Sequence, residues 1–277
     1  MRRLRPPRLA VWLALALAFA GCHQLDFTPR VQEGEIDIYD DLFAVSVSDE
    51  SHAVAVGYQG AAYLTEDGGE TWKQVHAAPD AQKPLLAVWF ENAERGIAVG
   101  TYSSLYETVD GGKTWKPGAA HEGDQHFNGL AAGPDGKLLL AGEAGLILRS
   151  DDAGRTWRRV ESPYKGSFFG ALAFGPGEWL IHGLRGNAFR TGDDGATWTA
   201  VHPAGAQATL MGGTRLPDGG ALLVGREGTV LESRGGGAAF TARKTPDGKS
   251  LAGALLLPSG ARVLVGEGGA TRHEPGR

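Results

Sequence analysis

The chain has 277 residues, of which 42% are hydrophobic and 21% are charged, with 43 glycines and one cysteine. This length allows one domain with a large core or two small ones, and glycine in this amount favours an all-β fold rich in tight turns. The formal net charge of −5 argues against nucleic acid and anionic lipid as partners, and one cysteine allows no internal disulfide.

The first segment predicts export from the cytoplasm. Four arginines lie within the first eight residues, and an apolar run from Leu9 to Phe19 follows that is too short to cross a bilayer. Phe19–Cys22 resembles a bacterial lipobox, in which Cys22 receives lipid and becomes the first mature residue. Cleavage after Ala20 by an ordinary signal peptidase is the alternative. We expect a lipoprotein signal peptide over residues 1–21, a tether over 22–26 and the folded domain over 27–277.

His23 bears on the location of the mature protein. In lipoproteins of Gram-negative bacteria, a residue other than Asp after the lipidated cysteine indicates the outer membrane. We therefore expect an outer-membrane lipoprotein on the periplasmic side of the bacterial cell envelope, held at the membrane surface through the lipid on Cys22.

One glycine recurs every 41 to 43 residues: Gly57, Gly100, Gly142, Gly183, Gly225 and Gly266. Fifteen residues before each lies an apolar residue: Leu42, Leu85, Phe127, Phe168, Leu210 and Leu251. In five units an aromatic follows fifteen residues after the glycine: Trp72, Trp115, Trp157, Trp198 and Phe240. All length variation falls between this aromatic and the next apolar residue, so packing fixes each unit except at one surface connection.

Each unit is predicted to form four short strands, which in the first unit are Phe43–Val47, Ala53–Val56, Ala61–Leu64 and Trp72–Val75. Four antiparallel strands in about 42 residues is the size of a propeller blade. The fold class predicted is therefore all-β, a six-bladed β-propeller of four-stranded antiparallel blades.

The sixth unit ends after three strands, the last of them expected at Ala270–Glu274. Phe27–Val31 resembles the fourth strands of the other units. We therefore expect this N-terminal strand to complete the last blade and close the ring, which removes open sheet edges. Seven blades is the alternative if residues 23–41 form more structure.

A repeated turn motif precedes the aromatic residue in four units. Its hydroxyl, acidic, glycine and aromatic members are Thr65, Asp67, Gly69 and Trp72; Thr108, Asp110, Gly112 and Trp115; Ser150, Asp152, Gly154 and Trp157; Thr191, Asp193, Gly195 and Trp198. The carboxylate and hydroxyl are expected to accept backbone N–H bonds inside the turn, and the indole to pack between blades. Each copy lies on a different blade, so the four carboxylates cannot converge on one metal ion.

The motif resembles the Asp-box, or BNR repeat, of sialidases, some glycoside hydrolases, sortilin-type receptors and the photosystem II stability/assembly factor-like family. The chain is most similar to the last of these over Phe27 to Glu274. Photosynthetic members of that family assist photosystem II assembly by binding a precursor of a reaction-centre subunit, and relatives occur in bacteria without photosynthesis. The resemblance implies a non-catalytic assembly factor that binds a membrane or exported protein.

The turns after the second strands are the candidate partner-binding site. In a ring, all six point to one face, and their residues vary while the scaffold does not. Tyrosine and arginine most often anchor interfaces. The candidate contacts are Tyr58, Gln59, Tyr102, Arg185 and Arg226.

A sialidase-like or other glycan-acting enzyme is the alternative function. That chemistry needs an arginine cluster, a tyrosine nucleophile paired with Glu and an aspartic acid/base, usually carried on long loops that this chain lacks. Other catalytic motifs are absent, and His121 and His126 fit an exposed connection better than a metal site. We expect no catalytic residues, no metal and no cofactor, and a monomer whose partner is a protein of the cell envelope.

Overall fold

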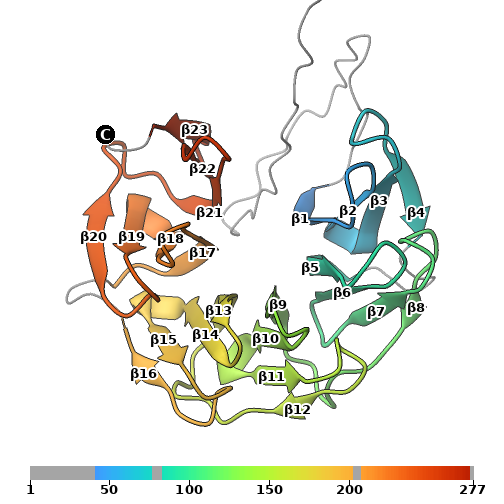
Figure 1. Cartoon of the computed structure of the whole chain (residues 1–277), viewed down its shortest axis with the longest axis horizontal. Helices are drawn as coiled ribbons and strands as arrows, with labels where there is room; N and C mark the ends of the chain where they lie inside the picture. The colour runs from blue at the N-terminus through green and yellow to red at the C-terminus, as the bar shows by residue number, and fades with distance from the viewer. Residues whose placement is uncertain (1–40, 77–82, 202–206, 275–277) are drawn as a thin grey trace, which may run out of the picture.

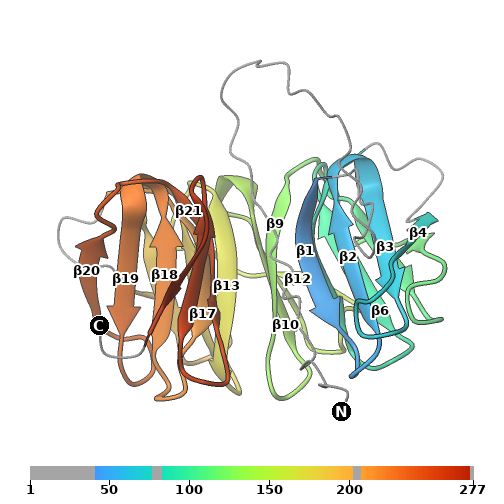
Figure 2. The ribbon, with the colours of Figure 1, turned by 90° about the horizontal axis from the view of Figure 1, so that it is seen from above.

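The computed structural model describes residues 41–76, 83–201 and 207–274, and these residues form six antiparallel sheets. Figure 1 shows the sheets arranged as blades around a central axis, with the first strand of each blade innermost. Figure 2, from the side, shows the strands running between two faces of the ring. The predicted six-bladed all-β propeller is thus confirmed.

The strands follow the repeat in chain order, with each strand paired to the next within its blade. Blade 1 contains β1 Leu42–Val47, β2 Ala53–Gly57, β3 Ala61–Thr65 and β4 Lys73–His76; blade 2, β5 Leu85–Phe90, β6 Gly96–Gly100, β7 Leu105–Thr108 and β8 Lys116–Pro117; blade 3, β9 Phe127–Ala132, β10 Leu138–Gly142, β11 Ile147–Ser150 and β12 Arg158–Arg159. Blade 4 contains β13 Phe168–Gly175, β14 Glu178–Gly183, β15 Ala188–Thr191 and β16 Thr199–Ala200; blade 5, β17 Leu210–Arg215, β18 Ala221–Gly225, β19 Thr229–Ser233 and β20 Phe240–Lys244; blade 6, β21 Leu251–Leu256, β22 Arg262–Gly266 and β23 Gly269–His273.

The core is divided among the blade interfaces. Five apolar clusters each combine side chains of two consecutive blades. The aromatic residue just before the fourth strand packs against the preceding blade: Trp115 lies in the cluster of blades 1 and 2, Trp157 in that of blades 2 and 3, and Trp198 in that of blades 3 and 4. The aromatic repeat therefore acts between blades rather than within one, as the sequence predicted.

A backbone contact repeated at every blade explains the recurring glycine. The residue after this glycine donates its N–H to the carbonyl that precedes the innermost strand, as in Tyr58 to Asp41 at 2.7 Å, Thr101 to Pro84 at 3.0 Å and Leu184 to Ser167 at 3.0 Å. The remaining blades make the same bond. A Cβ on the glycine would overlap this carbonyl oxygen, so the site accepts no side chain.

The last blade has three strands in the described part of the chain, β21, β22 and β23. In Figure 1, blades 1 and 6 lie at the two ends of the arc. The strand predicted at Phe27–Val31 lies outside the described residues, as does the seventh blade that residues 23–41 would supply, except for Asp41. Among the residues described, no helix is both long and apolar enough to cross a membrane.

A buried histidine at the interface of blades 4 and 5 makes stability depend on pH. His182 on β14 is 1% exposed, and burial lowers its pKa to about 4. Its Nδ1 lies 3.5 Å from the Leu210 carbonyl of the next blade. The imidazole is therefore neutral in the folded protein at neutral pH.

We expect the free energy of unfolding to fall as the pH falls from about 6.5 to about 4. In this window the unfolded chain protonates His182 while the folded chain does not, at a cost of up to about 3 kcal/mol. Urea unfolding at several pH values should show this slope in the wild type and a flatter one in His182→Asn. Parallel curves for the two proteins would contradict the assignment.

Candidate protein-binding face

The two faces of the ring carry different turns. The turns after the second strands share a face with the connections between blades, to which they are hydrogen-bonded. The Asp-box turns share the opposite face with the hairpins between first and second strands. Backbone hydrogen bonds of 2.8 to 3.0 Å join the two: the N–H groups of Gly68, Gly111 and Asp194 donate to the carbonyls of Ser51, Glu94 and Gly177, respectively. We call the first the 3₁₀ face, after its short helices, and the second the Asp-box face.

Four turns of the 3₁₀ face have the same conformation. They are the single-turn helices η1 Tyr58–Gly60, η2 Glu143–Gly145, η3 Leu184–Gly186 and η4 Arg226–Gly228. Their middle residues have left-handed backbone with φ of 51 to 57°, and each is followed by glycine: Gln59, Ala144, Arg185 and Glu227. All four middle residues are exposed. A rigid backbone thus presents a different side chain at the same place on each of these blades.

The structure brings the five predicted contact residues onto this face, on blades 1, 2, 4 and 5. Tyr58 is 46% exposed and Tyr102 is 56% exposed. Arg185 and Arg226 are exposed, and their side chains make no hydrogen bond or ion pair with any described residue. Gln59 is exposed as well. The five residues lie on four separate turns, with Tyr58 and Gln59 together in η1, so the arrangement is an open surface that suits a protein segment.

Two residues near Tyr102 were not predicted as contacts. The ring of His126 meets the Tyr102 ring edge-on at 5.0 Å between centroids, and Nζ of Lys83 lies 5.7 Å from the Tyr102 centroid. Both come from connections between blades, just before Leu85 and Phe127. That position is the signal that would have found them, because the residue before each innermost strand is bonded to the neighbouring turn.

On the other face, the Asp-box carboxylates are held inside their turns. In the first copy, Thr65 Oγ1 donates to Asp67 Oδ1 at 2.8 Å, and Asp67 accepts from the backbone and hydroxyl of Thr71 at 2.9 and 2.5 Å. The hydrogen bond from the Thr71 hydroxyl is the largest cause that lowers the pKa of Asp67 to about 2. The copies on Asp110, Asp152 and Asp193 repeat these bonds. The carboxylates are thus occupied with the backbone, and no group of described residues could hold a metal ion.

In the fifth unit, the corresponding turn is Ser233–Phe240, which has no Asp. The hydroxyl of Ser233 therefore makes different bonds. Ser233 Oγ accepts the N–H of Ala221 at 2.9 Å and donates to the carbonyl of the same residue at 3.4 Å. The turn after it contains three consecutive glycines with positive φ: Gly235, Gly236 and Gly237. Glycine therefore supplies in this blade the turn conformation that a carboxylate supports in the others.

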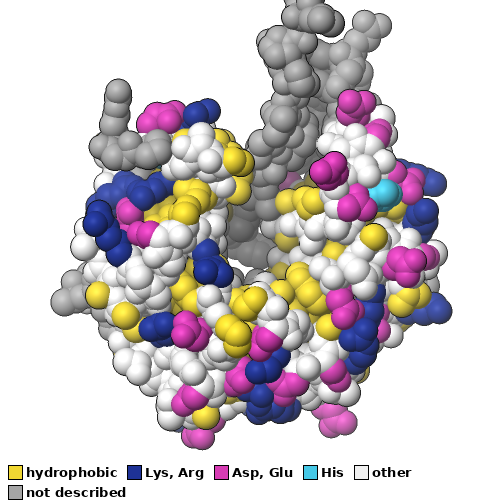
Figure 3. Space-filling model, in the orientation of Figure 1, with side chains coloured by type: hydrophobic (Ala, Val, Ile, Leu, Met, Phe, Trp, Pro, Cys, Tyr) yellow, Lys and Arg dark blue, Asp and Glu magenta, His cyan; other side chains and the backbone are white. Residues whose placement is uncertain are grey.

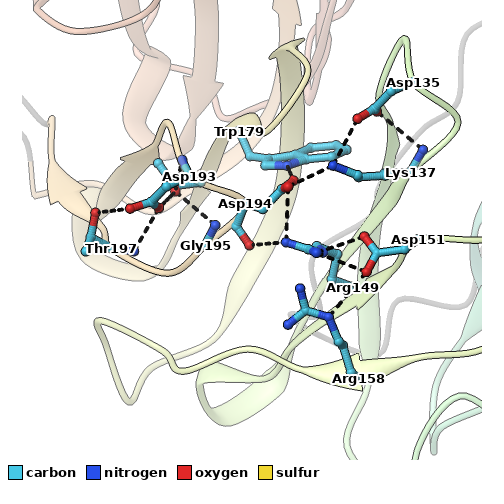
Figure 4. Close-up of polar contacts among 11 residues, drawn as sticks. Asp135, Lys137, Arg149, Asp151, Arg158, Trp179, Asp193, Asp194, Gly195 and Thr197 are labelled. Carbon is cyan, nitrogen blue, oxygen red and sulfur yellow. Dashed lines mark hydrogen bonds and ion pairs between the residues drawn. The ribbon is translucent and has the colours of Figure 1, made fainter.

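A charged network on the Asp-box face joins blades 3 and 4 (Figure 4). The Asp194 carboxylate forms an ion pair with Nζ of Lys137 at 2.7 Å. The backbone carbonyl of Asp194 accepts a hydrogen bond from Nη1 of Arg149 at 2.8 Å. Arg149 is 8% exposed and also pairs with Asp151 at 2.9 Å. These groups have partners within the protein, so they hold two blades together.

Figure 3 shows charged side chains toward the edge of the face in view and hydrophobic ones around its centre.

This geometry defines a β-propeller with Asp-box repeats and one face of varied, exposed turns. A family model described as photosynthesis system II assembly factor YCF48 matches residues 77–220, more than half of the chain. The chain belongs to this family.

Solved structures show the same fold. YCF48 bound to D1 peptide is 14% identical over 86% of this chain and 93% of that chain, with a TM-score of 0.61. YCF48 from Cyanidioschyzon merolae is 14% identical over 88% and 98%, with a TM-score of 0.59. A catalytically inactive virginiamycin B lyase from Staphylococcus aureus with quinupristin is 14% identical over 85% and 81%, with a TM-score of 0.74. No curated protein matches the sequence.

Proposed function

We propose that this protein is a non-catalytic assembly factor of the bacterial cell envelope, which binds a membrane or exported protein on its 3₁₀ face. The observation that carries the proposal is the exposure of Tyr58, Tyr102, Arg185 and Arg226 on turns whose backbone is held rigidly. Exposed tyrosine and unpaired arginine are the side chains that most often anchor protein interfaces. A relative of this family has been solved with a bound peptide, which supports protein binding.

An enzymatic role has less support from the site. The virginiamycin B lyase is an enzyme with the same fold, but at 14% identity the likeness extends to the fold alone. A sialidase-like mechanism pairs a tyrosine nucleophile with a Glu. Tyr58 and Tyr102, the exposed tyrosines of the described residues, make no hydrogen bond with a described carboxylate. Among the described residues, neither tyrosine therefore has the carboxylate partner that this chemistry requires.

Site-specific crosslinking tests the proposed face. A photo-crosslinking residue at Arg185 or Tyr58 is expected to capture one stoichiometric membrane or exported protein in cells. The matched control is Lys113, whose side chain is 61% exposed on the Asp-box face and pairs with Glu66. Capture from Lys113 alone would overturn the choice of face, and release of sugar from sialosides or glucans by the purified protein would overturn the non-catalytic role.

The location in the envelope is part of the proposal and has its own test. If Cys22 carries lipid, Cys22→Ser is expected to release the protein from the membrane fraction and to change its electrophoretic mobility. A lipid chain contributes about 0.8 kcal/mol per buried methylene to membrane binding, so its loss has a large effect. Unchanged membrane retention and mobility in Cys22→Ser would favour cleavage after Ala20.

A further inference from the structure

The turn of blade 2 differs from the other turns of the 3₁₀ face. Its residues Tyr102 and Ser103 both have left-handed backbone, with φ of 53 and 54°. In the four 3₁₀ turns, glycine occupies the position of Ser103: Gly60, Gly145, Gly186 and Gly228. Two successive non-glycine residues in this region are strained, and such strain is concentrated at binding and catalytic sites.

Hydrogen bonds to both neighbouring connections hold this strained turn. The N–H of Thr101 donates to Pro84 at 3.0 Å, and the N–H of Ser103 donates to Gln125 at 2.9 Å. The hydroxyl of Ser103 also reaches the Gln125 carbonyl at 3.2 Å, and the hydroxyl of Ser104 donates to Thr101 at 2.6 Å. The two connections that carry Lys83 and His126 are therefore fixed relative to Tyr102.

The cationic group at this site pairs with no carboxylate of the described residues. Lys83 makes no ion pair with any described carboxylate. Among the other described lysines, Lys113, Lys137 and Lys244 form ion pairs, and Lys73, Lys116, Lys165 and Lys249 form none. The ammonium of Lys83 and the imidazole of His126 both lie beside the Tyr102 ring, and Tyr102 is 56% exposed. Lys83, Tyr102 and His126 can all act as hydrogen-bond donors to an incoming acceptor.

Acidic residues close by limit what the site accepts. Glu122 and Asp124 precede His126 in the same connection, and the carboxylate of Glu143 accepts the backbone N–H of His126 at 3.3 Å. These charges repel a run of acidic residues, but none of the three carboxylates pairs with the ammonium of Lys83. The site therefore favours one carboxylate over several.

We propose that Lys83, Tyr102 and His126 bind a single carboxylate of an extended polypeptide segment. The inference rests on the proposed function and gives the partner's chemistry at one point of the 3₁₀ face. Lys83 supplies the charge, the Tyr102 hydroxyl and His126 supply hydrogen bonds, and the Tyr102 ring supplies contact area. The carboxylate has two sources, an acidic side chain or a chain terminus.

Peptide titrations of the mature protein, followed by NMR at low ionic strength, test the site. The probes are acetyl-Ala-Pro-Glu-Pro-Ala-amide, the same peptide with Gln in place of Glu, and the Gln peptide with a free terminal carboxylate. We expect the Glu or the free-terminus probe to shift the signals of Tyr102 and His126 and to bind at least about 5-fold more tightly than the Gln amide. The better of the two identifies the source, and equal binding of all three probes would overturn the proposal.

Matched lysine variants assign the effect to the site. Lys83→Gln is expected to abolish the preference for a carboxylate. Lys165→Gln, at an exposed lysine of the connection between blades 3 and 4, is expected to keep it. Both substitutions lie on the surface, so unfolding midpoints near the wild-type value are expected for both variants. Retained preference in Lys83→Gln would overturn the proposal.

The outcome is separable from that of the proposed function. A partner captured from Arg185 in wild type and equally in Lys83→Gln, together with equal binding of the three probes, would keep the assembly role and remove the carboxylate site. Probe binding that depends on Lys83, without any captured partner, would keep the site and remove the assembly role.

Discussion

The Gly183→Ala variant is expected to lose about 3 kcal/mol of unfolding free energy or to fail to fold. Gly183 ends β14 with an extended backbone, so its conformation does not require glycine. The surrounding atoms do require glycine, because a Cβ would overlap the carbonyl oxygen of Ser167 and lie 2.7 Å from the Cα of Phe168. Both are backbone atoms at the start of the innermost strand β13, and they cannot move aside as a flexible side chain would.

The damage would extend from one blade to its neighbour. The Ser167 carbonyl accepts the N–H of Leu184 at 3.0 Å, and Phe168, whose side chain is fully buried, pairs with Gly183. Displacing this carbonyl therefore breaks the bond that fixes the η3 turn and moves Phe168 within the cluster of blades 3 and 4. Arg185 lies in η3, so partner capture from this position should fall as well.

The control lies in the same blade. Gly192 has nothing within 4 Å of the place where a Cβ would stand, and its φ is not positive. Gly192→Ala should therefore stay within about 0.5 kcal/mol of the wild type. Urea unfolding followed by tryptophan fluorescence measures both variants, and equal midpoints for the two would remove the steric explanation for the recurring glycine.

The glycine spacing could be predicted from the sequence because one backbone approach recurs in every blade. The same approach fixes where each innermost strand begins, so the recurring apolar residues, such as Leu85 and Phe127, coincide with the observed strand starts. The first strand of blade 1, expected from Phe43, begins one residue earlier at Leu42. Ends of strands were predicted less well. The fourth strand of blade 1 was expected at Trp72–Val75 and is found at Lys73–His76, because Trp72 precedes the residues that pair with β3.

The contacts between connections and turns could not be predicted in the same way. The repeat places Lys83 and His126 just before an innermost strand, but connections vary in length and sequence from blade to blade, so it does not show that both side chains lie beside Tyr102. The network around Asp194 is also outside the repeat, since its partners Arg149 and Lys137 lie 45 and 57 residues away. Other copies of the motif carry Gly or Ala where Asp194 stands, so nothing in the shared pattern marks this position.

Removal of residues 23–31 from the mature chain is expected to lower the unfolding midpoint by about 10 °C and to cause self-association. In the five other blades the third strand pairs with a fourth, whereas in the described residues β23 pairs only with β22. The predicted strand Phe27–Val31 would cover this edge. Without it, β23 presents unpaired backbone groups to other chains.

The start of blade 1 supports a chain that arrives from blade 6. Asp41 accepts the N–H of Tyr58 at 2.7 Å, the bond that connections between blades make everywhere else in the ring. Val45 and Val47 on β1 are 45 and 68% exposed. Their equivalents on β5, Val88 and Phe90, pack against the preceding blade. Blade 1 thus has the polar and apolar features of a blade with a neighbour before it.

Thermal unfolding, light scattering and hydrogen exchange of the β23 amides test this prediction on chains that begin at His23 or at Gln32. The chain from His23 should be monomeric with slow exchange in β23, and the chain from Gln32 should associate and exchange rapidly there. Both chains keep residues 32–40, so the connection into β1 is the same and only the predicted strand differs. Equal midpoints and equal protection of β23 would show that the ring is stable without Phe27–Val31, and the fourth strand of blade 6 would then have to come from elsewhere.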